Sequence, residues 1–200
     1  MCKNKTIITM KKMAVFASGT GSNAVNLVKY FSGRKTGEVA LLISNNPDAP
    51  VLEKMKVLGI PAQVVAKEEF ESPSYMLPLL EKHGVSFIVL AGFLKLIPPY
   101  LIKAFENRIV NIHPALLPKY GGKGMYGARV HEAVVAAGEK ESGITIHYVN
   151  EHYDEGATIF QATCPVEKGD SPDDVARKVH ELEYAHFPEV VEKVLMAIQD

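Results

Sequence analysis

Residues 13–24 read Met13-Ala14-Val15-Phe16-Ala17-Ser18-Gly19-Thr20-Gly21-Ser22-Asn23-Ala24, an apolar run followed by a glycine-rich turn and the start of a helical pattern. A short apolar run without alternation is typical of a strand that is covered on both faces, as in parallel sheets. The glycines that follow suit a tight connection, because glycine adopts backbone conformations that other residues avoid. This stretch therefore predicts a strand, a loop and a helix, the first unit of an α/β fold.

The same unit recurs along the first half of the chain. Further apolar runs are Val39–Ile43, Ala62–Val65, Phe87–Leu90 and Arg108–Ile112. Helical patterns between the runs cover Asn23–Phe31, Ala49–Leu58 and, roughly, Glu71–Lys82. Because such crossovers are almost always right-handed, the repetition predicts a doubly wound, mostly parallel sheet.

The pattern changes after Asn111. A segment rich in proline and glycine, Pro114–Gly127, precedes a helix near Arg129–Ala137 and two late strands, Gly143–Asn150 and Ala157–Val166. We expect these late strands to be antiparallel. The first of them alternates apolar residues with polar or small ones, which predicts a half-exposed, mixed edge of the sheet.

A helix is expected to end the chain. Ser171 suits the N-cap, Pro172 the first helical position, and the acidic pair at 173–174 the positive end of the helix dipole. An apolar stripe continues to Ile198, and Pro188 is expected to break or kink the helix on the way.

Length and charge limit the functional classes. The chain has 200 residues, of which 47% are hydrophobic, with 22 Lys+Arg against 23 Asp+Glu. This size favours one domain, which we place at residues 12–200, with residues 1–11 as a disordered tail. The near-neutral charge gives no general attraction for nucleic acid, so we expect no nucleic-acid partner.

No apolar run is long enough to span a bilayer, and the first dozen residues lack the apolar stretch of a signal peptide. The two cysteines, Cys2 and Cys164, do not suggest a disulfide framework. We therefore expect a cytoplasmic protein without a membrane partner.

The glycine loop predicts an anion site. Read as Gly-x-Gly-x-x-Ala, residues 19–24 resemble a dinucleotide fingerprint, but no acidic residue follows the second strand to bind a ribose. The Lys-Ser/Thr ending of a Walker loop is also absent. Glycines at a helix N-terminus still let backbone N–H groups approach a phosphomonoester, and Ser22 and Asn23 add donors. The alternative is a tight turn without a ligand.

The fifth strand run carries the candidate catalytic residues. Asn111 and His113 are two positions apart and so lie on one face of the strand, at the end where α/β sheets bind ligands. Together they offer two donors to a developing oxyanion, and Asp154 in a later loop can orient and charge the imidazole. The alternative is that His113, next to a proline, is structural.

Other chemistries lack their residues. The histidines show neither His-x-x-x-His spacing nor cysteine partners, so we expect no metal site. Gly-x-Ser-x-Gly is absent, which argues against a nucleophile-elbow hydrolase. Direct transfer of a group between two bound substrates fits the remaining residues best.

Four motifs, in this order along the chain, resemble those of the phosphoribosylglycinamide formyltransferase family. They are Ala17-Ser18-Gly19-Thr20-Gly21-Ser22-Asn23, Leu90-Ala91-Gly92-Phe93-Leu94-Lys95, Asn111-Ile112-His113-Pro114-Ala115-Leu116-Leu117-Pro118 and Asp154-Glu155-Gly156. The resemblance runs from about Met13 to the C-terminus. It implies a Rossmann-like formyltransferase fold and transfer of a formyl group from 10-formyltetrahydrofolate, as co-substrate, to the amine of phosphoribosylglycinamide in purine synthesis.

The resemblance also implies roles for single residues. Asn111, His113 and Asp154 match the catalytic positions, with a protonated His113 whose pKa Asp154 raises. Phosphoribosylglycinamide would contact Gly21, Ser22, Asn23 and Glu183. Folate would contact Leu94, Lys95, Leu96, Ile97, Asn111, Asn150, Glu151, His152, Tyr153 and Asp154.

The chain departs from the family in two places. The segment Tyr120–Gly127 is longer and richer in glycine than is usual, and we expect a mobile lid there; the alternative is an ordinary surface loop. A basic residue that can contact the folate tail is replaced within Phe70-Glu71-Ser72-Pro73, which puts that contact in doubt, and Lys95 compensates only in part.

Three other functions stay open. A formyltetrahydrofolate hydrolase shares the catalytic trio but normally carries a further N-terminal domain, and a transfer-RNA formyltransferase carries a further C-terminal one. A non-catalytic module that binds a phosphoribosyl ligand is the alternative from another class. The sequence leaves the choice between a monomer and a homodimer open.

Overall fold

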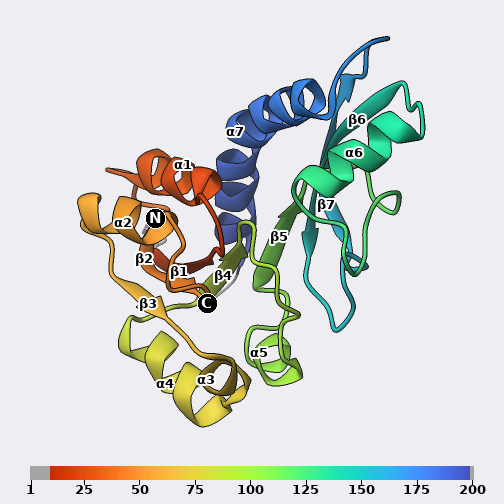
Figure 1. The fold of residues 1–200 in the computed structure, drawn as a ribbon. Coiled ribbons are helices and arrows are strands. Elements are labelled where there is room, and N and C mark those ends of the chain that lie inside the picture. The colour runs from red at the N-terminus through yellow and green to blue at the C-terminus, as the bar shows by residue number, and fades with distance from the viewer. Residues whose placement is uncertain (1–9, 199–200) are drawn as a thin grey trace, which may run out of the picture.

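The computed structural model describes residues 10–198, which form a seven-stranded sheet with helices on both faces (Figure 1). The expected tail lies almost wholly outside the described residues, but Lys11 already belongs to the first strand. The strand order is β3-β2-β1-β4-β5-β6-β7. The strands are β1 (Lys11–Phe16), β2 (Gly37–Ser44), β3 (Ala62–Val64), β4 (Phe87–Leu90), β5 (Ile109–His113), β6 (Glu141–Tyr148) and β7 (Thr158–Pro165).

The first five strands are parallel, and the last two are antiparallel to their neighbours. The predicted doubly wound fold with antiparallel late strands is confirmed. β5 therefore pairs with a parallel strand on one side and an antiparallel strand on the other. This places the ends of β5 and β6 next to loops that come from different parts of the chain.

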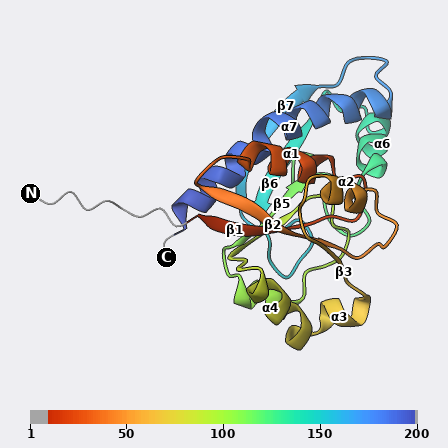
Figure 2. The ribbon, with the colours of Figure 1, turned by 90° about the vertical axis from the view of Figure 1, so that its left-hand side faces the viewer.

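The helices divide into two layers. They are α1 (Ser22–Phe31), α2 (Val51–Val57), α3 (Lys67–Glu71), α4 (Pro73–Lys82), α5 (Pro99–Ala104), α6 (Ala128–Ala136) and α7 (Pro172–Ala197). Figure 2 shows α1, α6 and α7 on one side of the sheet and α3 and α4 on the other.

Two apolar clusters fill the spaces between the sheet and these layers. Met13 and Val15 of β1 pack in one cluster with α1, α2, α6 and α7, whereas Ala14 and Phe16 pack in the other with α3, α4 and α5. Successive residues of a strand point to opposite faces, so an apolar run without alternation is what a strand covered on both faces requires.

The structure differs from the sequence expectations in three details. The helix expected roughly over 71–82 is α4, which begins at Pro73, and the short helix α3 before it was not predicted. α5 was not predicted. Pro188 lies inside α7 without ending it, and its burial in the core shows that packing holds the helix together across the missing N–H.

The half-exposed edge expected at 143–149 was also wrong, because β6 is an inner strand and its residues 142–147 are buried. Ile144 and Ile146 face the core under α7. On the other face, Thr145 donates a 2.7 Å hydrogen bond to the carbonyl of Ala115 and accepts one from the Leu117 amide. The loop after β5 thus buries Thr145, although the alternation of apolar and polar residues in β6 predicted that this position would be exposed. The partly exposed edge strand is β7.

Candidate active site

The glycine loop connects β1 to α1, as predicted. Gly21 precedes the helix with φ of 70°, in the left-handed region, and a Cβ there would overlap the side chain of Val51. Glycine is therefore required at this position both by conformation and by space. Residues 19–23 line a cavity of about 620 Å³, so the N-terminus of α1 opens into it.

The cavity brings together most of the predicted site residues. It is lined by Gly21, Ser22, Asn23, Leu94, Asn111, His113, Tyr153, Asp154 and Glu183. These residues come from β1–α1, β4, β5, the loop after β6, and α7. The carboxyl ends of β1, β4 and β5 thus meet α7 around one space, as expected for a ligand site of an open α/β sheet.

The other expected folate contacts do not line this cavity. Lys95, Leu96, Glu151 and His152 are exposed, and Asn150 is half-buried, with its side-chain oxygen accepting a 2.9 Å bond from the His152 amide. Ile97 is 2% exposed and packs in the core beneath α5. Leu94 and Leu96 leave 47% and 43% of their surface exposed.

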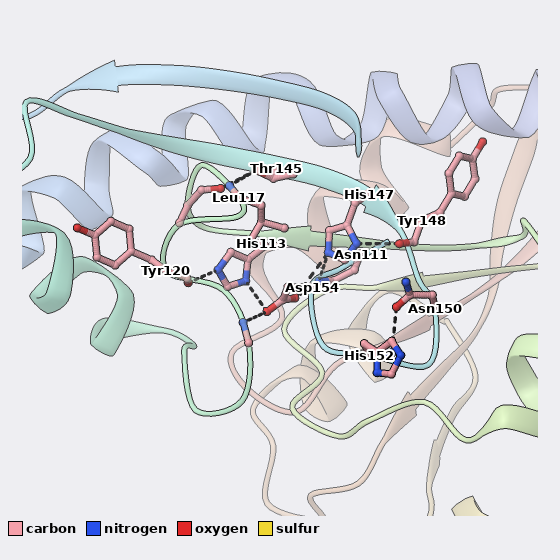
Figure 3. A network of polar contacts seen from close by, with 12 residues as sticks. Asn111, His113, Leu117, Tyr120, Thr145, His147, Tyr148, Asn150, His152 and Asp154 are labelled. Carbon is pink, nitrogen blue, oxygen red and sulfur yellow. Dashed lines mark hydrogen bonds and ion pairs between the residues drawn. The ribbon is translucent and has the colours of Figure 1, made fainter. Parts of the chain in front are cut away.

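Asn111, His113 and Asp154 lie together, as Figure 3 shows. Asp154 places Oδ2 3.6 Å from His113 Nδ1 and Oδ1 3.4 Å from Asn111 Nδ2. His113 and the Asp154 side chain are largely buried, with 4% and 12% exposed. The carboxylate therefore contacts both residues of β5 at once, in a partly dehydrated environment where charges interact strongly.

His147 is a further site residue, and the sequence reasoning missed it. It pairs with Asn111 across β5 and β6, and its Nε2 lies 3.0 Å from Asn111 Nδ2 and 3.6 Å from Asp154 Oδ1. Because His147 Nδ1 lies 2.8 Å from the carbonyl oxygen of Tyr148, the tautomer of the ring that fits this geometry has its proton on Nδ1 and accepts from Asn111 at Nε2. The orientation of the Asn111 amide follows from this assignment.

Both Nδ2 hydrogens of Asn111 consequently have protein partners. The bond to Asp154 is the longer one, at 3.4 Å, and is the one that a substrate oxygen can replace. Donation by Asn111 to an oxyanion thus requires its contact with Asp154 to give way.

One ring nitrogen of His113 is hydrogen-bonded. Nε2 donates to the carbonyl oxygen of Tyr120 at 2.8 Å, and Nδ1 lies 3.6 Å from Asp154 Oδ2, beyond hydrogen-bond distance. Burial lowers the pKa of His113 below its usual 6.5, although Asp154 and the bond to Tyr120 act to raise it. Asp154 thus acts in the expected direction, but the net pKa of His113 is lowered because loss of hydration outweighs the carboxylate.

The pKa of Asp154 is lowered. Burial alone would raise it, but the rings of His147 and His113 in their protonated forms, together with the Gly122 amide, outweigh burial. The Gly122 bond is 2.9 Å long and ends on Oδ2. Asp154 is thus an ionised group that the protein itself stabilises.

The loop that carries Asp154 closes tightly on β6. A Cβ at Gly156 would overlap the carbonyl oxygen of Tyr148, so only glycine fits there. Asp154 itself has φ of 57°, a conformation more common for Asp and Asn than for most residues. The turn over residues 154–156 is therefore fixed by the backbone fit of Gly156 against Tyr148 and by the hydrogen bond of the Asp154 side chain to Gly122.

The other end of the cavity is organised by Glu183. Its Oε2 accepts a 2.9 Å bond from Asn23 Nδ2 and a 2.7 Å bond from His180 Nδ1. The bond to Glu183 raises the pKa of His180. Asn23 and Glu183, which were predicted to bind the same ligand, are therefore in direct contact. His180 is a further residue at this end of the cavity, and it was not predicted from the sequence.

The glycine-rich segment also lines the cavity, through residues 122–127. Tyr120 and Gly122 hold His113 and Asp154 through backbone groups. Within residues 10–198 no cluster of His, Cys, Asp and Glu suits a metal ion. Across the same residues, no helix has the length and apolar character needed to cross a bilayer.

Residues 11–191 match the model of the formyl transferase family. The chain belongs to this family. A phosphoribosylglycinamide formyltransferase from Haemophilus influenzae is 37% identical over 187 residues, which cover 91% of this chain and 86% of that formyl transferase. A solved glycinamide ribonucleotide transformylase from Symbiobacterium toebii has a TM-score of 0.85 at 31% identity, covering 96% of this chain and 92% of its own.

A chloroplastic phosphoribosylglycinamide formyltransferase from Arabidopsis thaliana is 46% identical over 187 residues, which are 90% of this chain. The chain spans 64% of that formyl transferase and 61% of a similarly named protein from Vigna unguiculata. The predicted resemblance and fold are confirmed by these relatives.

Proposed function

We propose that this formyl transferase moves the formyl group of 10-formyltetrahydrofolate to the amine of phosphoribosylglycinamide, a step of purine synthesis. The observation that carries the proposal is the single cavity shared by the glycine loop and by Asn111, His113 and Asp154. A transfer between two bound substrates needs one site for both, and holding them together supplies much of the acceleration.

The phosphate is assigned to the glycine loop. Backbone N–H groups at the N-terminus of α1 carry partial positive charge, and Gly21, Ser22 and Asn23 all face the cavity. Glu183 takes the ribose or glycinamide part. Folate enters beside Leu94 and Tyr153, and its further proposed contacts are residues 95–97 and 150–152, of which Ile97 is buried, Asn150 is half-buried and the others are exposed.

The chemical step is attack of the amine on the formyl carbon, with charge growing on the formyl oxygen. Asn111 and His113 stabilise that oxygen, and His113 then gives a proton to the departing folate nitrogen. Asp154 counteracts the effect of burial on the His113 pKa and accepts the amine proton, directly or through water. No metal is assigned a role in these steps.

The deciding assay mixes the purified protein with both substrates and follows the release of tetrahydrofolate. Release that depends on phosphoribosylglycinamide and yields formylphosphoribosylglycinamide supports the proposal. Release that is independent of the ribonucleotide indicates a hydrolase, and no release with either indicates a binding module.

We also propose a cytoplasmic location, which the free thiol of the buried Cys164 favours over an oxidising compartment. The plant relatives are chloroplastic, so localisation of a tagged protein in its own cell is the test. Whether the enzyme is a monomer or a homodimer is decided by light scattering.

A further inference from the structure

His131 is a buried histidine in the first turns of α6 that no step above uses. It is 7% exposed and lines the main cavity. It also lines an adjoining cavity of about 310 Å³, and His180 and Glu183 lie on the wall common to both. His131 therefore stands at the Glu183 end of the site.

One nitrogen of this ring lacks a partner. Nδ1 is buried without a hydrogen bond in the described structure. Nε2 is not among the buried atoms that lack a partner. Buried N–H groups without a partner are rarer than buried acceptors without one, so the proton of the neutral ring belongs on Nε2. His131 then presents a donor to the cavity.

The ring is neutral at physiological pH. Burial lowers its pKa, the nearby charge of Glu183 acts to raise it, and His180 and His113 act to lower it. All three of these neighbours line the main cavity together with His131. A neutral donor and an acceptor-only carboxylate thus face the same part of the cavity.

The chemistry of both residues limits the ligand group between them. It must donate to Glu183 and accept from His131. A hydroxyl does both through one atom, an amide does so only through two different atoms, a phosphate dianion only accepts and an ammonium group only donates. The Asn23 Oδ1 atom, also buried without a partner in the described residues, adds an acceptor beside Glu183.

We infer that His131 is a substrate-binding residue, whose Nε2–H donates to a ribose hydroxyl that in turn donates to Glu183. The inference rests on the proposed function, because it takes its ligand from there. If His131 is purely structural, an apolar side chain of similar size should replace it without loss of substrate affinity, because the buried Nδ1 of the histidine has no hydrogen-bond partner.

The test measures kcat and KM with phosphoribosylglycinamide and with its 2′-deoxy and 3′-deoxy analogues. His131→Leu should raise KM for the natural substrate about tenfold, the usual effect of one lost hydrogen bond at a buried polar site, and leave KM for folate unchanged. For one of the deoxy analogues, His131→Leu should cause little further loss, because the partner hydroxyl is already absent.

Conservative variants identify the nitrogen. The amide of His131→Gln reaches the position of Nε2 and should restore part of the affinity, whereas His131→Asn reaches only the position of Nδ1 and should not. His131→Leu should melt at the wild-type temperature or above. His83→Leu, at the end of α4 and on no described cavity wall, and Val134→Ala, in the core of α6, control for histidine loss and for destabilisation.

An unchanged KM for phosphoribosylglycinamide in His131→Leu overturns the inference. Equal losses with the natural substrate and with both analogues also overturn it. Wild-type turnover reports on the proposed function separately. If the wild type binds the ribonucleotide in a calorimeter without turnover, the same comparison is made on Kd, and absence of binding by the wild type overturns both claims.

Discussion

The backbone amide of Gly122 donates a 2.9 Å hydrogen bond to Oδ2 of Asp154, the same oxygen that faces His113. Two residues earlier, the carbonyl of Tyr120 accepts from His113 Nε2. The glycine-rich segment thus holds both proposed catalytic side chains through its main chain. Because Nε2 of His113 is bonded to this segment, we expect movement of the segment and catalysis to be linked.

This link predicts the behaviour of the segment towards protease. Lys123 and Arg129 are exposed, so trypsin should cut there in the free enzyme. Both substrates together should slow the cuts about tenfold, because a lid that orders over ligands loses its local opening. Gel electrophoresis of timed digests measures the rate. An unchanged rate would mean an ordinary surface loop.

Removal of the catalytic imidazole should abolish turnover but not ribonucleotide binding. His113→Ala loses both the oxyanion donor and the general acid, and a fall in kcat of about 10³-fold is expected. Calorimetry with phosphoribosylglycinamide should give a Kd within about threefold of wild type. Loss of binding together with activity would indicate that His113 is structural.

Neutralising Asp154 should shift the titration of His113 downwards. Asp154 is the largest influence that raises the pKa of His113 against burial, so in Asp154→Asn burial is opposed less and the pKa falls further. NMR titration of the ring protons of His113 measures the shift, and kcat should drop about 10²-fold. An unchanged pKa would show that the two side chains are not coupled.

Loss of the Glu183 charge should act on one substrate only. Glu183→Gln removes the negative charge from the acceptor shared by Asn23 and His180 and replaces one carboxylate oxygen by an amide donor, so KM for phosphoribosylglycinamide should rise about tenfold. The pKa of His180 should return towards its ordinary value, because the bond to Glu183 is the main cause of its rise. A comparable rise in KM for folate would place Glu183 elsewhere in the site.

The pH dependence of stability should reveal the buried histidine of α6. The pKa of His131 is lower in the folded protein than its usual 6.5, so below that pH the unfolded chain binds the proton first and stability falls. His131→Leu removes this penalty, and should gain roughly 1 kcal/mol relative to wild type between pH 7 and pH 5. Urea unfolding at several pH values measures the difference; parallel curves would show a His131 pKa close to normal.

Residue periodicity was sufficient to predict the sheet and the pair on β5. Apolar runs defined the first five strands, and two-residue spacing placed Asn111 and His113 on one face. The same spacing could not show His147, because it reaches Asn111 through the antiparallel register of β5 and β6. That register depends on contacts between distant residues.

Main-chain contacts also escaped prediction. Tyr120 and Gly122 act on the catalytic residues through a carbonyl and an amide, groups that every non-proline residue possesses. Burial was misjudged where polar residues have unexpected partners. Thr145 is fully buried because the loop after β5 satisfies its hydroxyl, and His113 has a lowered pKa because the fold dehydrates it.

The close fit of Gly156 against Tyr148 has a consequence for mutational tolerance. A library randomised over residues 149–157 and selected for activity should retain glycine at 156 almost without exception, while the neighbouring exposed Glu155 should accept many side chains. Redesign of folate specificity in this loop is therefore best confined to side chains on its outer surface. The backbone path beneath them is a fixed support for the catalytic carboxylate.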